Sequence, residues 1–298
     1  MKDAKQLRAD LLLLAVVTSW GLSYIANDIC LECMEPLFII AVRFLGAFVV
    51  AVMFSVKRVF HANKDTIKYG AIMGAILCLV YIGSTYGIKC TTQSNCAFLV
   101  SMTAIFVPIF SWCIFKEKLS KKTVLCVALC FIGMCLFVLK PDFSINMDTL
   151  TGDLWSIQCA ITYAFHIIFM GKFVRREGVD AYALGVIQLG FCGVFSLILS
   201  LALSSQTFPQ TGPQWIALAF IVVFCSGVAF ICQPIAQQHT TPEHTALIFA
   251  LEPVIASVVA YFFNDEILTP RGYIGAVMML LAVVFMEVDF KKDSPPEM

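Results

Sequence analysis

Charged residues are scarce in this 298-residue chain, and the scarcity narrows the class of protein. Asp, Glu, Lys and Arg make up 13% of the sequence, hydrophobic residues make up 60%, and the mean hydropathy is +0.87. Soluble globular domains contain roughly 25% charged residues. We therefore predict an all-α integral membrane protein whose apolar side chains face the lipid bilayer. The bilayer is thus one of its predicted partners.

Sequence patterns for catalysis and for nucleotide-driven pumping are also missing. The chain contains no His-Glu-x-x-His, no Gly-x-Ser-x-Gly, no Walker A sequence and no intramembrane pair of aspartates. It has no basic patch interleaved with aromatic residues, so nucleic acid is not expected as a partner. We expect no enzymatic activity, no cofactor and no metal site.

Cysteine, in contrast, is plentiful, with 13 residues. Most of them lie inside apolar runs, where a thiol behaves as a small apolar residue. Cys30 and Cys33 form the one C-x-x-C pair, and it lacks the βαβ context of a thioredoxin-like motif. A redox or metal role for this pair is a minor alternative to coincidence.

Apolar runs long enough to cross about 30 Å of hydrocarbon recur along the chain. We predict ten transmembrane helices, at about Leu11–Asn27, Leu37–Val56, Tyr69–Ile88, Asn95–Phe115, Val124–Leu139, Leu154–Gly171, Tyr182–Leu203, Trp215–Ala236, Thr245–Phe263 and Tyr273–Val288. Placing the N-terminus in the cytoplasm puts sixteen Lys and Arg on inner segments and three on outer loops. This bias predicts that both termini, including a tail at 289–298, are cytoplasmic.

The two halves of the chain match at an offset of 149 residues. The offset places Thr240-Thr241 on Thr91-Thr92, Ala246 on Ala97, Glu266 on Glu117 and Leu268 on Leu119. We therefore predict two five-helix repeats, at 10–139 and 153–288. Because five is odd, the second repeat enters the membrane inverted. Inverted repeats are typical of secondary transporters, which bind substrate near the bilayer midplane between the repeats.

Several pieces of sequence, in a fixed order, resemble one family of transporters. They are Ser19-Trp20-Gly21, Arg43, the stretch 87–99, Val107-Pro108, Lys116-Glu117-Lys118-Leu119, the stretch 245–254 and Asp265-Glu266. Together they resemble the EamA-type transporters of the drug/metabolite transporter superfamily, over nearly the whole chain from about Asp10 to Val288.

The resemblance implies a fold and a function. It implies ten helices in two inverted repeats, with spans 5 and 10 peripheral to a central cavity. It also implies transport of small metabolites, often the export of amino acids or related compounds. This chain departs from symmetry, because Tyr163-Ala164 replaces Trp20-Gly21 and Gln188 stands where the first half has Arg43.

Glu252 is the first candidate for a residue that binds a proton or a ligand. It lies in the middle of an apolar run, where a charge costs about 2.5–3.5 kcal/mol on insertion scales and should face the protein interior. It is either a proton-coupling carboxylate or ligand contact, or a buried structural residue. Pro108 and Pro253 are candidate helix breaks. The first repeat has Thr103 in place of Glu252, so a symmetric two-carboxylate exchange of protons is not supported.

Further polar residues form helix faces that would converge on a cavity. Arg43 lies about 10 Å inside its span and either holds a substrate carboxylate or locks the helix through a structural pair. His166 is a second, weaker candidate for proton coupling. The cavity candidates are Trp20, Ser23, Tyr24, Asn27, Arg43, Tyr81, Thr85, Thr103, Tyr163, His166, Gln188, Gln233 and Gln237. For each, interhelical hydrogen bonding is the competing interpretation.

The leading hypothesis is a secondary, non-ATP transporter of small metabolites that works by alternating access. We expect it to export amino acids or related, partly apolar solutes across a bacterial plasma (cytoplasmic) membrane, with proton coupling possible. The competing hypothesis is a membrane-embedded sensor or assembly partner that has kept a transporter fold.

Overall fold

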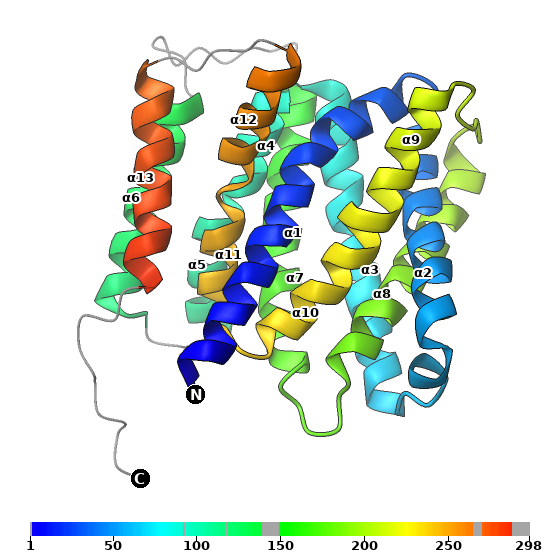
Figure 1. The fold of residues 1–298 in the computed structure, drawn as a ribbon, viewed down its shortest axis with the longest axis horizontal. Helices are drawn as coiled ribbons and strands as arrows, with labels where there is room; N and C mark the ends of the chain where they lie inside the picture. Colours follow the sequence, from blue (N-terminus) through cyan, green and yellow to red (C-terminus); the bar gives the residue numbers. More distant parts are fainter. Residues whose placement is uncertain (1, 92, 117–118, 139–148, 265–269, 288–298) are drawn as a thin grey trace.

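A computed structural model describes residues 2–91, 93–116, 119–138, 149–264 and 270–287. These residues form helices joined by short connections, with no strand among them (Figure 1). Two segments that match at the sequence offset, 117–118 and 265–269, lie outside the described residues. They hold Glu117 and Glu266. The tail at 289–298 also lies outside them.

The helices follow one another closely along the chain. Their bounds are α1 (Lys2–Leu31), α2 (Pro36–Phe60), α3 (Lys64–Cys90), α4 (Gln93–Ser101), α5 (Thr103–Phe115), α6 (Lys121–Val138), α7 (Leu150–Phe173), α8 (Ala181–Leu203), α9 (Gly212–Phe220), the π-helical segment η1 (Ile221–Val228), α10 (Ala229–Gln237), α11 (Pro242–Phe249), α12 (Glu252–Asn264) and α13 (Pro270–Glu287).

Capping residues explain where several of these helices begin. The Asn63 side chain accepts a hydrogen bond from the amide of Thr66 at the start of α3. Asp180 accepts from the amides of Tyr182 and Ala183 at the start of α8. Such side chains satisfy amides that have no partner within the helix.

Within the described residues, seven helical stretches are long and apolar enough to span a membrane. They are Ala4–Leu31, Pro36–Phe60, Lys64–Cys90, Cys96–Phe115, Leu150–Phe173, Ala181–Leu203 and Gly212–Gln237, and Pro270–Phe285 is a shorter apolar helix. The prediction of an all-helical membrane protein is confirmed for the described residues. The predicted total of ten spans is a finer statement that stays a prediction.

Two helical stretches are interrupted at matching places. One interruption, at Met102, separates α4 from α5, and the other, at Ala250 and Leu251, separates α11 from α12. Met102 and Leu251 are 149 residues apart, which is the offset found in the sequence. Pro253 lies in the first turn after the second interruption, whereas Pro108 lies inside α5, beyond the first.

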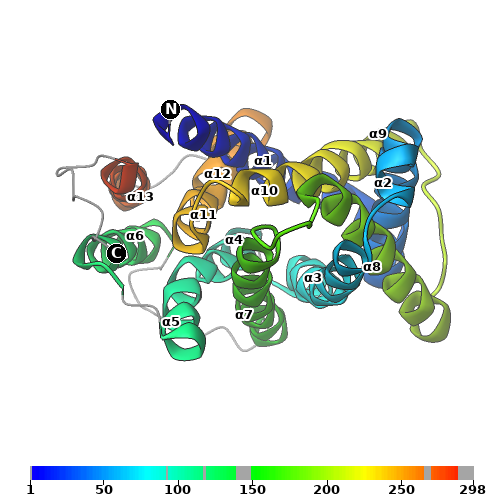
Figure 2. The same cartoon turned by 90° about the horizontal axis from the view of Figure 1, so that it is seen from below.

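The packing of the helices also comes in matching pairs. The helix α3 packs on α7, and α10 packs on α1; α4 and α5 pack on α7, and α11 and α12 pack on α1. The helices α2 and α8 contact each other, and so do α6 and α13. Figure 2 shows α6 and α13 side by side at one edge of the bundle, away from the helices at its centre.

Candidate functional site

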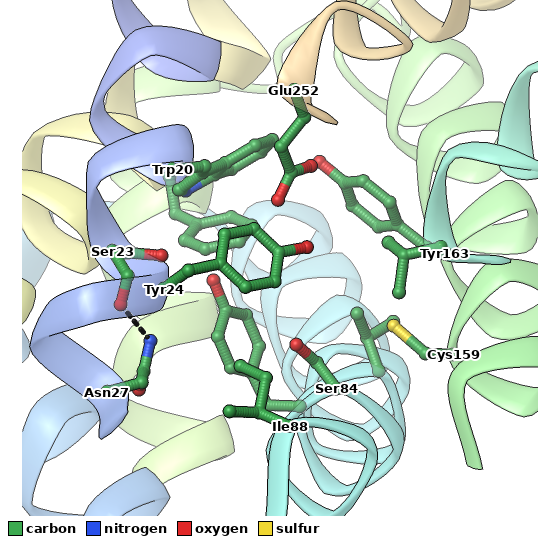
Figure 3. Close-up of a pocket in the computed structure, with 13 residues that line it drawn as sticks. Trp20, Ser23, Tyr24, Asn27, Ser84, Ile88, Cys159, Tyr163 and Glu252 are labelled. Atoms are coloured by element: carbon green, nitrogen blue, oxygen red, sulfur yellow. Dashed lines mark hydrogen bonds between the residues drawn. The ribbon is translucent and has the colours of Figure 1, made fainter. Parts of the chain in front are cut away.

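A small cavity lies between helices from both halves of the chain, and Figure 3 shows the side chains that line it. Its walls come from α1, α3, α4, α7, α10 and α12, and its lining residues are Trp20, Ser23, Tyr24, Asn27, Val80, Tyr81, Ser84, Ile88, Val100, Cys159, Tyr163, Phe230 and Glu252. The space open to the centre of a water molecule is about 40 Å³. One water needs about 10–15 Å³ on this measure, so the cavity has room for a few waters.

Glu252 enters this cavity from the point where its helix is interrupted. It is the first residue of α12, and 9% of it is exposed. Figure 3 shows its carboxylate pointing into the space between the rings of Trp20, Tyr24 and Tyr163. The free amides at a helix N-terminus carry a partial positive charge, which favours an anionic side chain at this end.

The equivalent position in the first half has a different role. Thr103 is the first residue of α5, as Glu252 is of α12. Its hydroxyl lies 2.6 Å from the carbonyl oxygen of Val100 and 3.2 Å from that of Ala160 on α7. Thr103 is therefore occupied in holding α5 against α7, and it does not line the cavity.

Aromatic rings close the cavity on the side nearer the N-terminus of α1. The Trp20 ring centroid lies 5.8 Å from that of Tyr163, 5.3 Å from that of Phe230 and 4.8 Å from that of Phe249. The Trp20 indole nitrogen donates to the carbonyl oxygen of Cys225 at 2.9 Å. That carbonyl belongs to η1, and a π-helical turn leaves backbone groups open to such partners.

Arg43 lies behind the cavity wall and not in it. Its guanidinium donates to the Ser226 hydroxyl at 2.8 Å and to the Asn27 side-chain oxygen at 3.3 Å, and it lies 4.4 Å from the centroid of the Tyr81 ring. The residue is 1% exposed, and its Nη2 has no hydrogen-bond partner. Arg43 thus orients Asn27 and Tyr81, two residues that do line the cavity.

Among the described residues, no carboxylate lies within salt-bridge distance of the Arg43 guanidinium. Its counterparts are the neutral groups of Ser226 and Asn27 and the ring of Tyr81. A cation–π contact of this kind is strongest where water is excluded.

Four other predicted residues form two buried hydrogen-bonded pairs beside the cavity. His166 Nε2 lies 3.0 Å from the Gln188 side-chain oxygen, and Gln188 donates to the carbonyl oxygen of Phe230. Gln233 donates to Gln237 at 3.2 Å, and Gln237 donates to the carbonyl oxygen of Ile167. The Tyr163 hydroxyl lies 3.5 Å from Gln233 and links this second pair to the cavity wall.

The structure therefore brings about half of the predicted site residues to the cavity. Those on its wall are Trp20, Ser23, Tyr24, Asn27, Tyr81, Tyr163 and Glu252, and those away from it are Arg43, Thr85, Thr103, His166, Gln188, Gln233 and Gln237. Ser84 lies three residues after Tyr81, and this helical spacing signals it as a wall residue. Val80, Ile88, Val100, Cys159 and Phe230 are apolar residues among many and carry no such signal.

A helical membrane protein with a buried carboxylate at an interrupted helix belongs to a class that includes secondary transporters. The EamA-like transporter family model matches this chain twice, at residues 7–139 and 150–288. The chain therefore belongs to the EamA-like transporter family, within the drug/metabolite transporter superfamily. It is a membrane transporter by family, and its resemblance to that family in sequence is confirmed.

Curated relatives carry transporter names. An "Uncharacterized transporter" of Archaeoglobus fulgidus is 29% identical over 291 residues, covering 96% of this chain and 88% of its own. An "S-adenosylmethionine uptake transporter" of Rickettsia felis is 24% identical and covers 78% of each chain. A "Probable amino-acid metabolite efflux pump" of Salmonella typhimurium is 23% identical and covers 63% and 62%.

The fold also has a counterpart among solved structures. One crystal structure superposes with a TM-score of 0.75, covering 93% of this chain and 96% of that one, at 15% sequence identity. At this identity the likeness concerns the fold alone.

Proposed function

We propose that this protein is a secondary transporter of small metabolites, built from two inverted five-helix repeats at 10–139 and 153–288. The observation that carries the proposal is the interruption of α4–α5 and α11–α12 at equivalent residues, with Glu252 at one of them facing a buried cavity. Half-helices that end near the bilayer midplane form the binding sites of many transporters. Ten spans with both termini in the cytoplasm follow from the repeat and from the Lys and Arg bias.

The size of the cavity supports alternating access. The space of about 40 Å³ has room for a few waters, so the helices around it would have to separate before a larger solute enters. The helix α1 of the first repeat packs against α11 and α12 of the second, and α7 of the second repeat packs against α4 and α5 of the first. If one repeat rocked against the other, the cavity would open to each face of the membrane in turn.

The wall of the cavity indicates the class of solute. Trp20, Tyr24, Tyr81 and Tyr163 contribute aromatic rings to it, and Glu252 supplies the one carboxylate among the lining residues. Such a wall suits a partly apolar solute with a cationic or amino group, because aromatic faces and a carboxylate both attract positive charge. Amino acids and related compounds fit this description, and we propose export from the cytoplasm across the plasma membrane.

Proton coupling is the role that we propose for Glu252. A carboxylate in a buried cavity binds either a proton or a cationic solute, and competition between them couples the two movements. His166 is a weaker candidate, because it is bonded to Gln188 and does not line the cavity.

The test is flux in liposomes, with a panel of radiolabelled amino acids and hydrophobic cations. For any solute that moves, Glu252→Gln should remove the dependence on an imposed proton gradient and lower coupled flux by at least about tenfold, a change of 1.4 kcal/mol in barrier. Glu177→Gln, in an exposed turn, is the matched control and should leave flux unchanged. Fluxes no higher than those of empty liposomes, together with a normal cellular phenotype for both variants, would favour the sensor hypothesis.

A further inference from the structure

A second cavity lies on the outside of the bundle and plays no part in the site above. It is an apolar groove of about 320 Å³ between α2 on one side and η1 and α10 on the other. Its lining residues are Ala47, Val50, Ala51, Phe54, Tyr182, Val222, Val223, Gly227, Val228, Ile231 and Cys232. Both walls belong to candidate membrane spans, so the groove opens within the depth of the bilayer.

The groove continues into a polar pocket at the end of α2. This pocket, of about 580 Å³, is lined by residues 53–58 and Tyr182, and it shares Phe54 and Tyr182 with the groove. The helix α2 bends here, because Ser55 has a non-helical backbone conformation (φ −139°, ψ 24°). The bend places an apolar channel and a basic pocket end to end.

The charge of the pocket is positive. Arg58 pairs with Asp180 through two hydrogen bonds of 2.5 and 2.8 Å and lies over the Tyr182 ring, 4.6 Å from its centroid. This pair is neutral as a whole. Lys57 is exposed and adds a positive charge, and no carboxylate lines the pocket to balance it.

We propose that the groove and the pocket together bind one anionic phospholipid, with an acyl chain in the groove and the headgroup phosphate at Lys57. The apolar groove suits the acyl chain of such a lipid, and the Lys57 ammonium at its end suits the negatively charged headgroup. Basic pockets between membrane helices on the cytoplasmic side are suited to anionic headgroups, and the proposed orientation puts the end of α2 on that side.

The lipid would touch the segment that supports the central cavity. Val222 and Gly227 of η1 line the groove, and the same segment holds Trp20 through the Cys225 carbonyl and Arg43 through the Ser226 hydroxyl. The site is defined without reference to transport, and it rests on the proposed function only for placing the end of α2 on the cytoplasmic side.

The experiment is native mass spectrometry of the delipidated full chain in detergent, titrated with a phosphatidylglycerol or a phosphatidylcholine of the same acyl chains. The unmodified protein should retain one phosphatidylglycerol in preference to phosphatidylcholine. Lys57→Gln should weaken phosphatidylglycerol binding by about fivefold, the effect of one Lys near an anionic lipid surface. Lys68→Gln removes an equally exposed charge outside the pocket and should have no effect.

A second pair of variants tests the groove. Val228→Phe, at a side chain that is 47% exposed, should fill the groove and weaken binding of both lipids, whereas Val194→Phe, at 45% exposure on α8, should not. Equal retention of the two lipids, or equal effects of a variant and its control, would overturn the proposal. Loss of the bound phosphatidylglycerol on addition of inorganic phosphate alone would also overturn it. So would a dimer that Val228→Phe converts to a monomer, because a second copy of the chain would then occupy the groove.

Discussion

Glu252 and Thr103 hold equivalent positions and illustrate how far residue-level reasoning reaches. The sequence offset identified the pair and the lack of symmetry between them. It could not reveal that Thr103 is bonded to the backbone of α7, while Glu252 faces the cavity, because both facts depend on how helices from different halves meet. A buried polar residue is apparent from the sequence, whereas the group that satisfies it is not.

Arg43 makes the buried contacts that fit the second of its two predicted roles, that of a structural residue. It is a positioning residue, since it contacts Asn27, Ser226 and Tyr81 and does not line the cavity. Arg43→Met should destabilise the protein by about 1–3 kcal/mol, because Ser226 and Asn27 each lose a buried partner. Thermal unfolding in detergent measures the loss, with the exposed Arg8→Gln as the control. Equal midpoints for the two variants would show that the buried contacts contribute nothing.

At the scale of elements, the lengths of the apolar runs and the positions of the charged residues locate the helices. They do not locate the interruptions and π-helical segments within them. The runs predicted from the sequence overlap the seven candidate spans. The interruption at Met102 lies six residues before Pro108, and η1 contains no proline at all. Trp20 and Arg43, which lie far from η1 in sequence, both donate hydrogen bonds to it. Contacts of this kind cannot be read from the local sequence.

Gly21 allows α1 and α12 to pack at very close range. A Cβ atom at this position would lie 2.6 Å from Cγ2 of Ile255 and 3.1 Å from the amide nitrogen of Ala256. Gly21→Val should therefore force the two helices apart and cost about 1–3 kcal/mol, as overpacking does. The thermal midpoint measures this, and Gly212→Ala, at a glycine with open space around it, should change it little. A Gly21→Val protein as stable as the unmodified chain would mean that these helices separate freely.

Asp180 joins the end of α2 to the start of α8. Burial alone would raise the pKa of this carboxyl, but hydrogen bonds from Arg58 and from the amides of Ala183 and Tyr182 outweigh burial and lower it. A lowered pKa stabilises the fold above the ordinary Asp value of about 3.9 and loses that effect as the pH falls through the lowered value.

Two variants separate the charge of Asp180 from its capping role. Asp180→Asn keeps an N-cap and loses the ion pair, so at neutral pH it should cost at most about 1 kcal/mol, and the cost should vanish in acid. Asp180→Ala should cost about 1 kcal/mol more, through loss of the cap. Unfolding measured between pH 3 and 7 (a range set by the ordinary Asp pKa of about 3.9) tests both. A cost for Asp180→Asn that does not change with pH would contradict the ion-pair assignment.

At the scale of the whole molecule, the repeat is what made the architecture predictable. The double match to one family model and the paired packing of α1 and α7 agree with a duplication seen first as a constant offset. The offset gave no information on which end of the bundle is closed in the observed conformation. That depends on contacts between segments far apart in sequence, at the two ends of α1.

The end of the molecule that holds the N-terminus of α1 is closed by buried contacts. His244 Nε2 lies 3.1 Å from Asp10 Oδ1, with the two side chains 10% and 9% exposed, and Gln6 donates to both Asp10 and Thr240. The opposite end has the pair of Lys89 and Glu35, whose side chains are 42% and 41% exposed. Exposed ion pairs contribute about 0–1 kcal/mol. Losing one partner of a buried polar contact costs about 1–3 kcal/mol, because the other group is left unsatisfied.

This difference predicts which end is harder to open. Asp10→Ala should raise amide hydrogen exchange in the turn between α10 and α11, at residues 238–241, by about tenfold, which corresponds to 1.4 kcal/mol in the opening equilibrium. Glu35→Gln, the control at the opposite end, should raise exchange there only slightly and leave residues 238–241 unchanged. If both variants changed exchange at both ends, the two closures would not be independent, and separate opening of each end, which alternating access requires, would lose its structural basis.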